Sequence, residues 1–226
     1  MEQKSQASEV KAYDFAIIEI VKAGFVWIEG MKTPFVIAVS LYVGIGLLTQ
    51  FILGMIFSIG TIEEPNLLNI QIIGILSYPV LMPLLVGIMM MALNYTRGNS
   101  IDFKSMFNYY HLTGKLALVA VLMYGMMMLG FKLFIIPGIY LSVAYVFAPL
   151  LIVDKQMGVW EAMEHSRKAV TKQWFKVARL MFLLGFISFL GFLALGIGLI
   201  WAIPLMFVTL YGLLYPLIFD EDEEEA

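Results

Sequence analysis

The chain has 226 residues, of which 61% are hydrophobic and 14% charged, and its formal net charge is −3. Its mean hydropathy of +0.89 excludes an ordinary soluble domain. It contains no cysteine, which excludes disulfides, thiolate metal sites and cysteine nucleophiles.

Six long apolar runs predict an all-α, polytopic membrane protein. Each run has roughly the 17–25 residues that an α-helix needs to cross a bilayer. The links between the runs are short, so we expect residues 1–226 to form a single membrane domain. The runs cover residues 33–59, 67–95, 116–134, 135–153, 177–195 and 199–219.

Segment 10–31, ahead of the first run, has apolar residues at helical spacing with charged residues between them. That pattern is typical of an amphipathic helix that lies in the membrane interface. Further surface helices are expected at 101–110 and 158–171. Charges in the first 30 residues argue against a cleavable signal peptide. The apolar residues of the first segment are Val10, Ile17, Ile18, Val21, Phe25 and Ile28.

The basic residues are distributed unequally along the chain. Of the 14 Lys and Arg residues, 12 precede the first run or lie between the second and third runs or the fourth and fifth runs, and Arg179 lies at the very start of the fifth run. Only Lys132 lies in the alternate connections. By the positive-inside rule, we expect both termini to be cytoplasmic.

A shared proline spacing relates the fourth and sixth runs. Pro137 and Pro149 are 12 residues apart, and so are Pro204 and Pro216. The chain therefore reads as a three-unit pseudo-repeat, each unit consisting of a surface helix, an ascending span, a tight turn and a descending span. Internal repeats are common in membrane folds.

Proline removes a backbone donor, so these spans should kink and leave carbonyls that need other partners. Ser142 and Thr209 each follow a proline by five residues and are expected to help. A broken-helix binding site is one interpretation; simple kinks and close packing are favoured. The kink or packing candidates are Pro79, Pro83, Pro137, Gly138, Ser142, Pro149, Pro204, Thr209 and Pro216.

The middles of the runs contain no Asp, Glu, Lys, Arg or His. Proton relays and ion-coupled pumps normally require such residues, so the pattern argues against them. His111 and His165 lie at the expected cytoplasmic boundary without further ligands at metal-binding spacing. No nucleophile with partners, phosphate loop or paired-carboxylate site is evident. We therefore expect no enzymatic activity, no metal and no cofactor.

Segment 155–179 concentrates basic and indole side chains. Such residues favour binding of anionic lipid or of a protein partner, although orientation in the membrane alone would also require the charges. The acidic tail 220–226 is expected to be solvated or to fold back onto 167–179. The candidate surface consists of Trp160, Arg167, Lys168, Lys172, Trp174, Lys176 and Arg179.

The stretch IIPGIYLSVAYVFAPLLIVDKQMGVWEAMEHSRKAVTKQWFKV resembles a pattern in bacterial membrane proteins related to the membrane domain of glycerophosphodiester phosphodiesterases. A Pro-Gly opens a span, an acidic residue ends it, and a helix leads through Ser to a basic and aromatic entry. The resemblance implies a bacterial inner-membrane location. It does not imply phosphodiesterase activity, because the catalytic domain is absent. The matching residues are Pro137, Gly138, Asp154, Glu161, Ala162, Ser166 and Trp174.

These observations lead to one expectation and one alternative. We expect a non-enzymatic accessory or envelope-maintenance factor that engages membrane lipids or a membrane-protein partner, and not nucleic acid, through its cytoplasmic helices. The alternative is a small transporter or channel, in which the kinked spans form a path for a neutral or amphiphilic solute.

Overall fold

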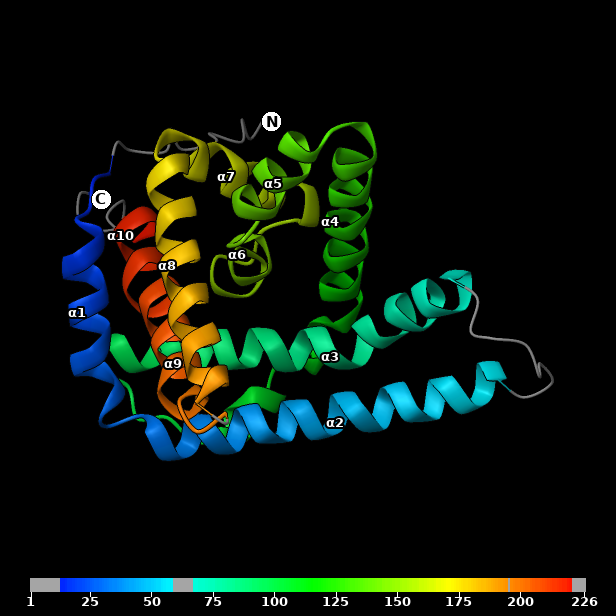
Figure 1. Ribbon diagram of the computed structural model, residues 1–226, viewed down its shortest axis with the longest axis horizontal. Helices are drawn as coiled ribbons and strands as arrows, with labels where there is room; N and C mark the ends of the chain where they lie inside the picture. Colours follow the sequence, from blue (N-terminus) through cyan, green and yellow to red (C-terminus); the bar gives the residue numbers. More distant parts are fainter. Residues whose placement is uncertain (1–12, 59–66, 195, 221–226) are drawn as a thin grey trace, which may run out of the picture.

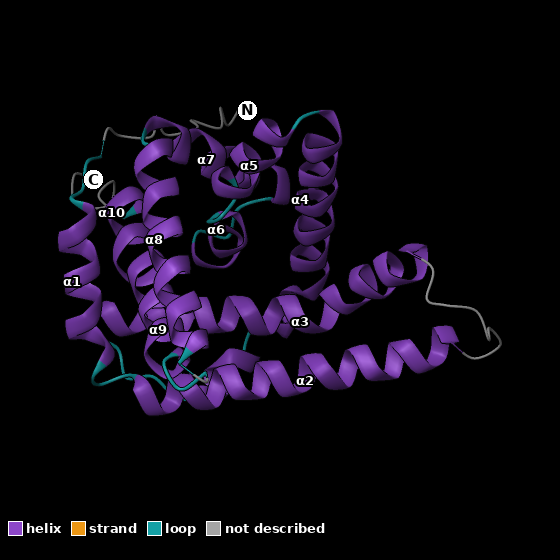
Figure 2. Cartoon of the chain, in the orientation of Figure 1, coloured by secondary structure: helices purple, strands orange, loops and turns teal. Residues whose placement is uncertain are grey.

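The computed structural model describes residues 13–58, 67–194 and 196–220, which form helices without a strand (Figures 1 and 2). Residues 1–12, the connection 59–66 and the tail 221–226 lie outside the described residues. The α-helices are α1 (Ile17–Ile28), α2 (Lys32–Ser58), α3 (Leu67–Thr96), α4 (Thr113–Leu133), α5 (Ile135–Ala144), α6 (Ala148–Asp154), α7 (Val159–Lys172), α8 (Trp174–Leu193), α9 (Leu199–Phe207) and α10 (Tyr215–Phe219). Two 3-10 helices, η1 (Phe103–Phe107) and η2 (Tyr110–Leu112), precede α4, and a π-helix, η3 (Val208–Leu214), joins α9 to α10.

Six helical segments of the described chain are long and apolar enough to cross a membrane, so the protein is an all-α, multi-pass membrane protein. The segments agree with the predicted runs apart from their ends. The fourth is divided between α5 and α6, and the sixth between α9, η3 and α10. The segments are Lys32–Phe57, Leu68–Thr96, Phe103–Leu133, Ile135–Asp154, Trp174–Leu193 and Leu199–Phe219.

The six spans form three helical hairpins, α2–α3, α4–α5 and α8–α9, which are not parallel to one another. Helices α2 and α3 pair through a 3.0 Å hydrogen bond from Gln50 Nε2 to Ser77 Oγ and run across the view, whereas α4 and α8 run from top to bottom (Figure 1). Lys32 Nζ lies 5.9 Å from the ring centroid of Trp201, so α2 and α9 begin side by side. The sequence interpretation placed these two residues at opposite membrane faces. Because α2 and α3 are apolar on every side, their pattern does not fix the direction in which they pack.

Helix α1 packs along the last span. An ideal Cβ on Gly24 would lie 3.7 Å from Thr209 Cβ and 3.0 Å from Leu205 Cδ1. Val21 and Ile28, on the same face of α1, are buried. The helix predicted over 10–31 is described as α1, and glycine at position 24 lets its buried face pack closely against η3 and α9. Its place in the membrane interface stays a prediction.

The segment predicted as one helix over 101–110 instead forms the two short helices η1 and η2. The backbone N–H of Lys104 donates to Asp102 Oδ1 at 3.1 Å, so Asp102 caps η1. Gly87 of α3 contacts the backbone of Met106 in η1, where any side chain would clash. This close approach requires glycine at position 87. The predicted helix at 158–171 is confirmed as α7.

The fourth span is interrupted at residues 145–147, immediately before Pro149. Ser166 of α7 is fully buried beside this break. Its hydroxyl donates to Ala144 O at 2.8 Å and accepts from the Phe147 N–H at 3.3 Å. One side chain from a neighbouring helix therefore satisfies a backbone acceptor and a backbone donor at the break.

The sixth span contains an equivalent irregularity, the π-helix η3, directly before Pro216. Pro216 has no N–H, so the carbonyl of Gly212, four residues earlier, loses its usual helical partner. Thr96 Oγ1 of α3 donates to Gly212 O at 2.7 Å. Gly212 is tightly enclosed, because an added Cβ would lie 2.8 Å from Thr96 Cγ2.

The expected role of Ser142 and Thr209 at these irregularities is therefore wrong. Ser142 Oγ donates within its own helix, to Ile139 O at 2.8 Å. Thr209 is fully buried against α1, and its hydroxyl has no hydrogen-bond partner in the described residues. Pro137 lies in the first turn of α5 and Pro204 lies within α9, whereas Pro149 and Pro216 follow the irregularities. Pro79 and Pro83 lie inside α3, which bends along its length (Figure 1).

Two hairpins close on pairs of glycines. In α4–α5, a Cβ on Gly130 would lie 2.9 Å from the Gly138 nitrogen. In α8–α9, a Cβ on Gly191 would lie 2.8 Å from the Gly198 carbonyl carbon. Such contacts require glycine at both hairpins. Together with the two irregular spans, they support the predicted repeat for the last two units.

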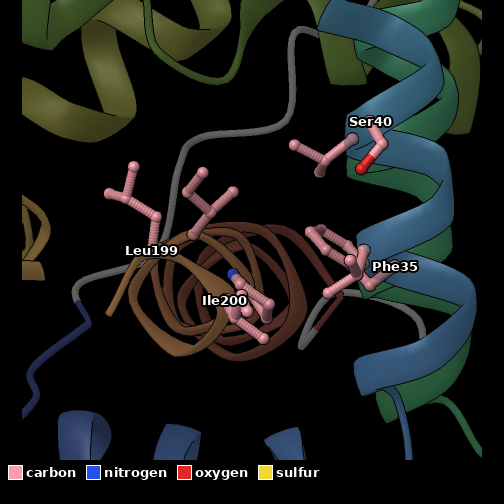
Figure 3. A pocket seen from close by; sticks show the side chains of 8 residues that line it. Phe35, Ser40, Leu199 and Ile200 are labelled. Atoms are coloured by element: carbon pink, nitrogen blue, oxygen red, sulfur yellow. The ribbon is translucent and has the colours of Figure 1, made fainter. Parts of the chain in front are cut away.

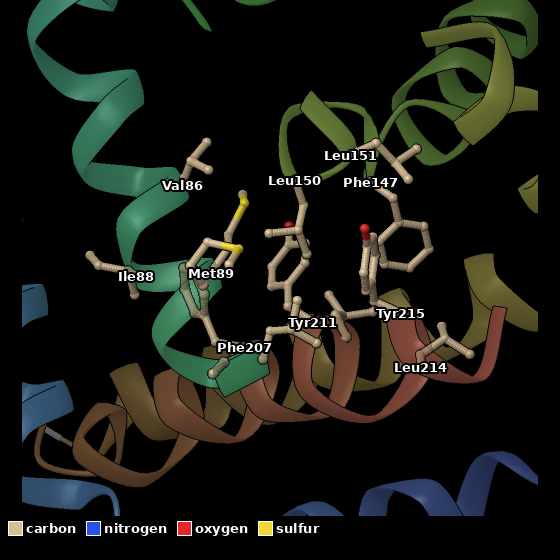
Figure 4. Close-up of a cluster of buried hydrophobic side chains, with 14 of the residues drawn as sticks. Val86, Ile88, Met89, Phe147, Leu150, Leu151, Phe207, Tyr211, Leu214 and Tyr215 are labelled. Carbon is tan, nitrogen blue, oxygen red and sulfur yellow. The ribbon is translucent and has the colours of Figure 1, made fainter. Parts of the chain in front are cut away.

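The core lies between α3, α6 and the last span (Figure 4). Phe147 packs edge-on against Tyr211 and Tyr215, with ring centroids 6.1 and 5.9 Å apart. Met89 and Leu150 fill the space beside these rings and are buried. Tightly packed aromatic side chains therefore occupy the region between the two irregular spans.

Candidate functional site

Helix α7 brings together both ends of the described chain. Tyr13 OH donates to Ala169 O at 3.3 Å, near the C-terminal end of the helix. The ring of Phe219, near the other end of the chain, lies 5.6 Å from the His165 ring. Helix α7 therefore contacts segments from both ends of the described chain.

An ion-pair network joins the ends of three spans. Arg97, directly after α3, donates from Nη1 to Asp154 Oδ1 and from Nη2 to Asp220 Oδ2, each at 2.7 Å. Tyr215 OH donates to Asp154 Oδ2 at 2.9 Å, and Lys155 Nζ lies 3.1 Å from Asp220 Oδ1. The hydrogen bond to Asp154 raises the pKa of Arg97 above its ordinary value. Because its charges are paired with one another, this network connects the ends of the three spans and leaves no free charge for a ligand.

Arg167 and Lys168, two residues of the predicted surface, share one acidic partner on α7. Arg167 Nη2 donates to Glu164 Oε1 at 2.7 Å, and Lys168 Nζ lies 3.6 Å from the same oxygen. The hydrogen bond from Arg167 lowers the pKa of Glu164. Trp160, on the same helix, is 64% exposed. None of these three residues lines the groove described next, although Thr171 of that groove donates to Arg167 O at 2.6 Å.

A groove of about 480 Å³ lies at the junction of α7 and α8. Helix α7 ends at Lys172, Gln173 leaves the helical conformation with φ −129°, and α8 begins at Trp174. Lys176 and Arg179 follow on the exposed side of α8. The groove is lined by Ile136, Tyr140, Thr171, Lys172, Gln173, Trp174, Phe175, Lys176 and Arg179.

Aromatic contacts fix one wall of the groove. Trp174 Nε1 donates to Tyr140 O at 3.2 Å, and the two rings stack with centroids 6.1 Å apart. Tyr140 OH lies 2.6 Å from Thr171 Oγ1. Phe175 meets Trp174 edge-on and is 74% exposed. An apolar wall, whose indole N–H is already bonded to Tyr140 O, is therefore held beside the basic residues.

The cations of the groove differ in how they are paired. Lys172 is exposed and has no acidic partner within the described ranges. Arg179 is exposed and donates only from Nε, to Phe175 O at 3.0 Å. Lys176 contacts the exposed carboxylate of Asp14, whose pKa this contact lowers. An anion in the groove could therefore be contacted by Lys172, by the two terminal nitrogens of Arg179, and by Lys176, whose partner Asp14 is exposed.

A separate cavity of about 160 Å³ lies between α2 and α9 and has no titratable lining residue (Figure 3). Ser40 supplies its one polar side chain. Such a slot fits an apolar chain and provides no group for acid, base or nucleophilic chemistry. The other lining residues are Phe35, Val36, Val39, Leu199, Ile200, Ile203 and Pro204.

The described residues contain no cluster of three His, Asp or Glu side chains that could hold a metal ion. His111 Nδ1 lies 2.9 Å from Asn108 O, and the His165 ring packs on Phe219.

Comparison with known proteins gives no further guide: no family model, curated protein or solved structure matches the chain. The resemblance to the membrane domain of glycerophosphodiester phosphodiesterases stays a prediction that rests on the residues quoted for it.

The structure brings together four of the seven predicted surface residues: Lys172, Trp174, Lys176 and Arg179. Sequence reasoning missed Tyr140 and Asp14, which come from elements far away in the chain. Tyr140 lies inside an apolar run and gave no polar pattern, and Asp14 read only as one of the charged residues on the polar face of the helix predicted over 10–31.

Proposed function

We propose that the protein is a non-enzymatic inner-membrane protein that binds the headgroups of anionic phospholipids in the groove at the α7–α8 junction. The observation that supports this most is the set of unpaired or weakly paired cations, Lys172, Lys176 and Arg179, beside the exposed ring of Phe175. Basic side chains near an anionic leaflet each contribute about 1 kcal/mol. Tryptophan and exposed apolar side chains suit the boundary between headgroups and acyl chains.

Both termini lie on the cytoplasmic side in this proposal. The charge distribution favours that orientation, and the packing of Tyr13 and Phe219 on α7 is consistent with both ends being on one side. Ile136 and Trp174, at the starts of the fourth and fifth spans, line the same groove, whereas the charge pattern places these two starts on opposite sides. Impermeant thiol reagents applied from outside should therefore fail to label a cysteine introduced at position 168, and labelling there would reverse the orientation.

The function is that of an accessory or envelope-maintenance factor that recognises lipid composition. The transporter alternative has less support, because packed aromatic side chains such as Phe147 and Tyr211 occupy the space between the two irregular spans.

The test replaces Lys172, Lys176 and Arg179 with Gln in the full chain and counts bound lipids by native mass spectrometry. Detergent-solubilised protein is titrated with phosphatidylglycerol and, separately, with phosphatidylcholine. We expect the wild type to prefer phosphatidylglycerol and the triple variant to bind it at least about tenfold more weakly, since roughly 1 kcal/mol is lost per cation.

A matched control replaces Lys104, Lys115 and Lys168 with Gln, which removes the same total charge away from the groove. This control should keep the wild-type preference. Equal losses in both triple variants would show a general charge effect and would contradict the proposed site.

A further inference from the structure

A second groove lies beside the first and shares its cations. It has a volume of about 690 Å³ and lies between the start of α1 and α8. Lys176 and Arg179 line both grooves. The two cations therefore form a ridge with a groove on either side. The second groove is lined by Phe15, Ala16, Ile17, Ile18, Glu19, Lys22, Lys176 and Arg179.

Each groove also has one lysine of its own. Lys172 lines only the first groove, and Lys22 lines only the second. Like Lys172, Lys22 has no acidic partner in the part of the chain that the structure describes. The arrangement is thus two neighbouring basic grooves that share two cations. Each groove also has one lysine that lines it alone, called its private lysine below.

The apolar residues are also divided between the two sides. Ile136, 79% exposed, and Phe175, 74% exposed, belong to the first groove. Ile18, 67% exposed, belongs to the second. Each anion site therefore has its own apolar surface beside it, as a headgroup with attached acyl chains requires.

We propose that the two grooves together bind one bis-phosphatidyl lipid of the cardiolipin type, with one phosphate in each groove. This rests on the proposed binding of anionic lipid in the first groove. A lipid with one phosphate can use only one of the private lysines, Lys172 or Lys22. A lipid whose two phosphates are joined by a short linker uses both lysines and the shared Lys176 and Arg179.

Asp14 is the internal competitor of this ligand. Its carboxylate contacts Lys176 on the ridge between the grooves, and its side chain is 73% exposed. Exposed ion pairs contribute little to stability, so a phosphate can displace Asp14 at small cost. Glu19, in the second groove, opposes a phosphate there, which gives Lys22 a compensating role.

Linkage of the two phosphates makes the second contact intramolecular, which raises affinity without new kinds of contact. We therefore expect cardiolipin to bind at least about tenfold more tightly than phosphatidylglycerol at equal total phosphate. Native mass spectrometry of the full chain, titrated with each lipid and with phosphatidylcholine as reference, measures this ratio.

Two single variants test whether Lys172 and Lys22 each bind one of the two phosphates. Lys172→Gln and Lys22→Gln should each reduce the preference for cardiolipin over phosphatidylglycerol to nearly one while binding of phosphatidylglycerol persists. Lys104→Gln removes a lysine that lines neither groove and should leave the preference unchanged.

The outcomes separate the two proposals. If phosphatidylglycerol and cardiolipin bind equally per phosphate, or if Lys22→Gln has no effect, the bis-phosphatidyl ligand is rejected while lipid binding in the first groove stands. If phosphatidylglycerol binds no better than phosphatidylcholine, the proposed function itself fails.

Discussion

At the scale of single residues, two hydroxyls hold the interrupted spans together. Ser166 bonds to both sides of the break between α5 and α6, and Thr96 bonds to the carbonyl that Pro216 leaves without its helical partner. In hydrocarbon an unpaired backbone group is costly because no water can reach it. These side chains are therefore structural requirements of irregular spans and are not reactive groups.

Replacement of Thr96 with Val should lower stability by about 1 kcal/mol, because the Gly212 carbonyl loses its donor while the side-chain volume is kept. Thermal unfolding in mild detergent measures the change. Thr96→Ser, which keeps the hydroxyl, is the control and should lose less. Equal melting temperatures for wild type and Thr96→Val would show that the carbonyl has another partner.

The residue scale was also where sequence reasoning was weakest. The sequence indicated correctly that the proline spans need extra hydroxyl donors, but it assigned Ser142 and Thr209 because they are nearby in the chain. The donors come from other helices, and Thr96 is 116 residues from Gly212. A single sequence carries no signal for such a contact, because Thr96 reads only as a polar residue at the end of a span.

At the scale of elements, α1 shows how a glycine changes the role of a helix. Its charged and apolar residues alternate as in a surface helix, yet Gly24 packs against Thr209 of the last span. Packing of this kind is typical of small residues in membrane helices. Sequence periodicity predicted the helix and its apolar face but not the surface that this face contacts.

The contact predicts a disulfide. The Cβ–Cβ distance of 3.7 Å between an ideal Cβ on Gly24 and Thr209 is close to the mean of about 3.8 Å in disulfides. On this cysteine-free background, Gly24→Cys combined with Thr209→Cys should cross-link under mild oxidation, as seen by altered mobility on a denaturing gel. Gly24→Cys combined with Leu193→Cys should not cross-link. Failure of the first pair to form a disulfide would contradict the packing of α1 against the last span.

At the scale of the whole molecule, hydropathy sufficed to predict the six spans, because their apolar runs are long and nearly free of charge. Their arrangement did not follow from it. Lys32 lies beside Trp201, and α2–α3 runs across α4 and α8 (Figure 1). Charge indicated the candidate groove in part: Lys172, Lys176 and Arg179 were predicted as surface cations, but Arg167, also predicted, pairs with Glu164 and does not line the groove.

The most direct test of anionic-lipid binding in the groove uses Trp174 as a reporter, with the other three tryptophans replaced: Trp27→Phe, Trp160→Phe and Trp201→Phe. The protein is reconstituted in mixtures of phosphatidylglycerol and phosphatidylcholine of one composition, in which either lipid carries bromine, a fluorescence quencher. We expect stronger quenching of Trp174 when phosphatidylglycerol is brominated, and loss of this difference when Lys172, Lys176 and Arg179 are replaced with Gln. Equal quenching by the two brominated lipids in the protein with intact cations would contradict the account.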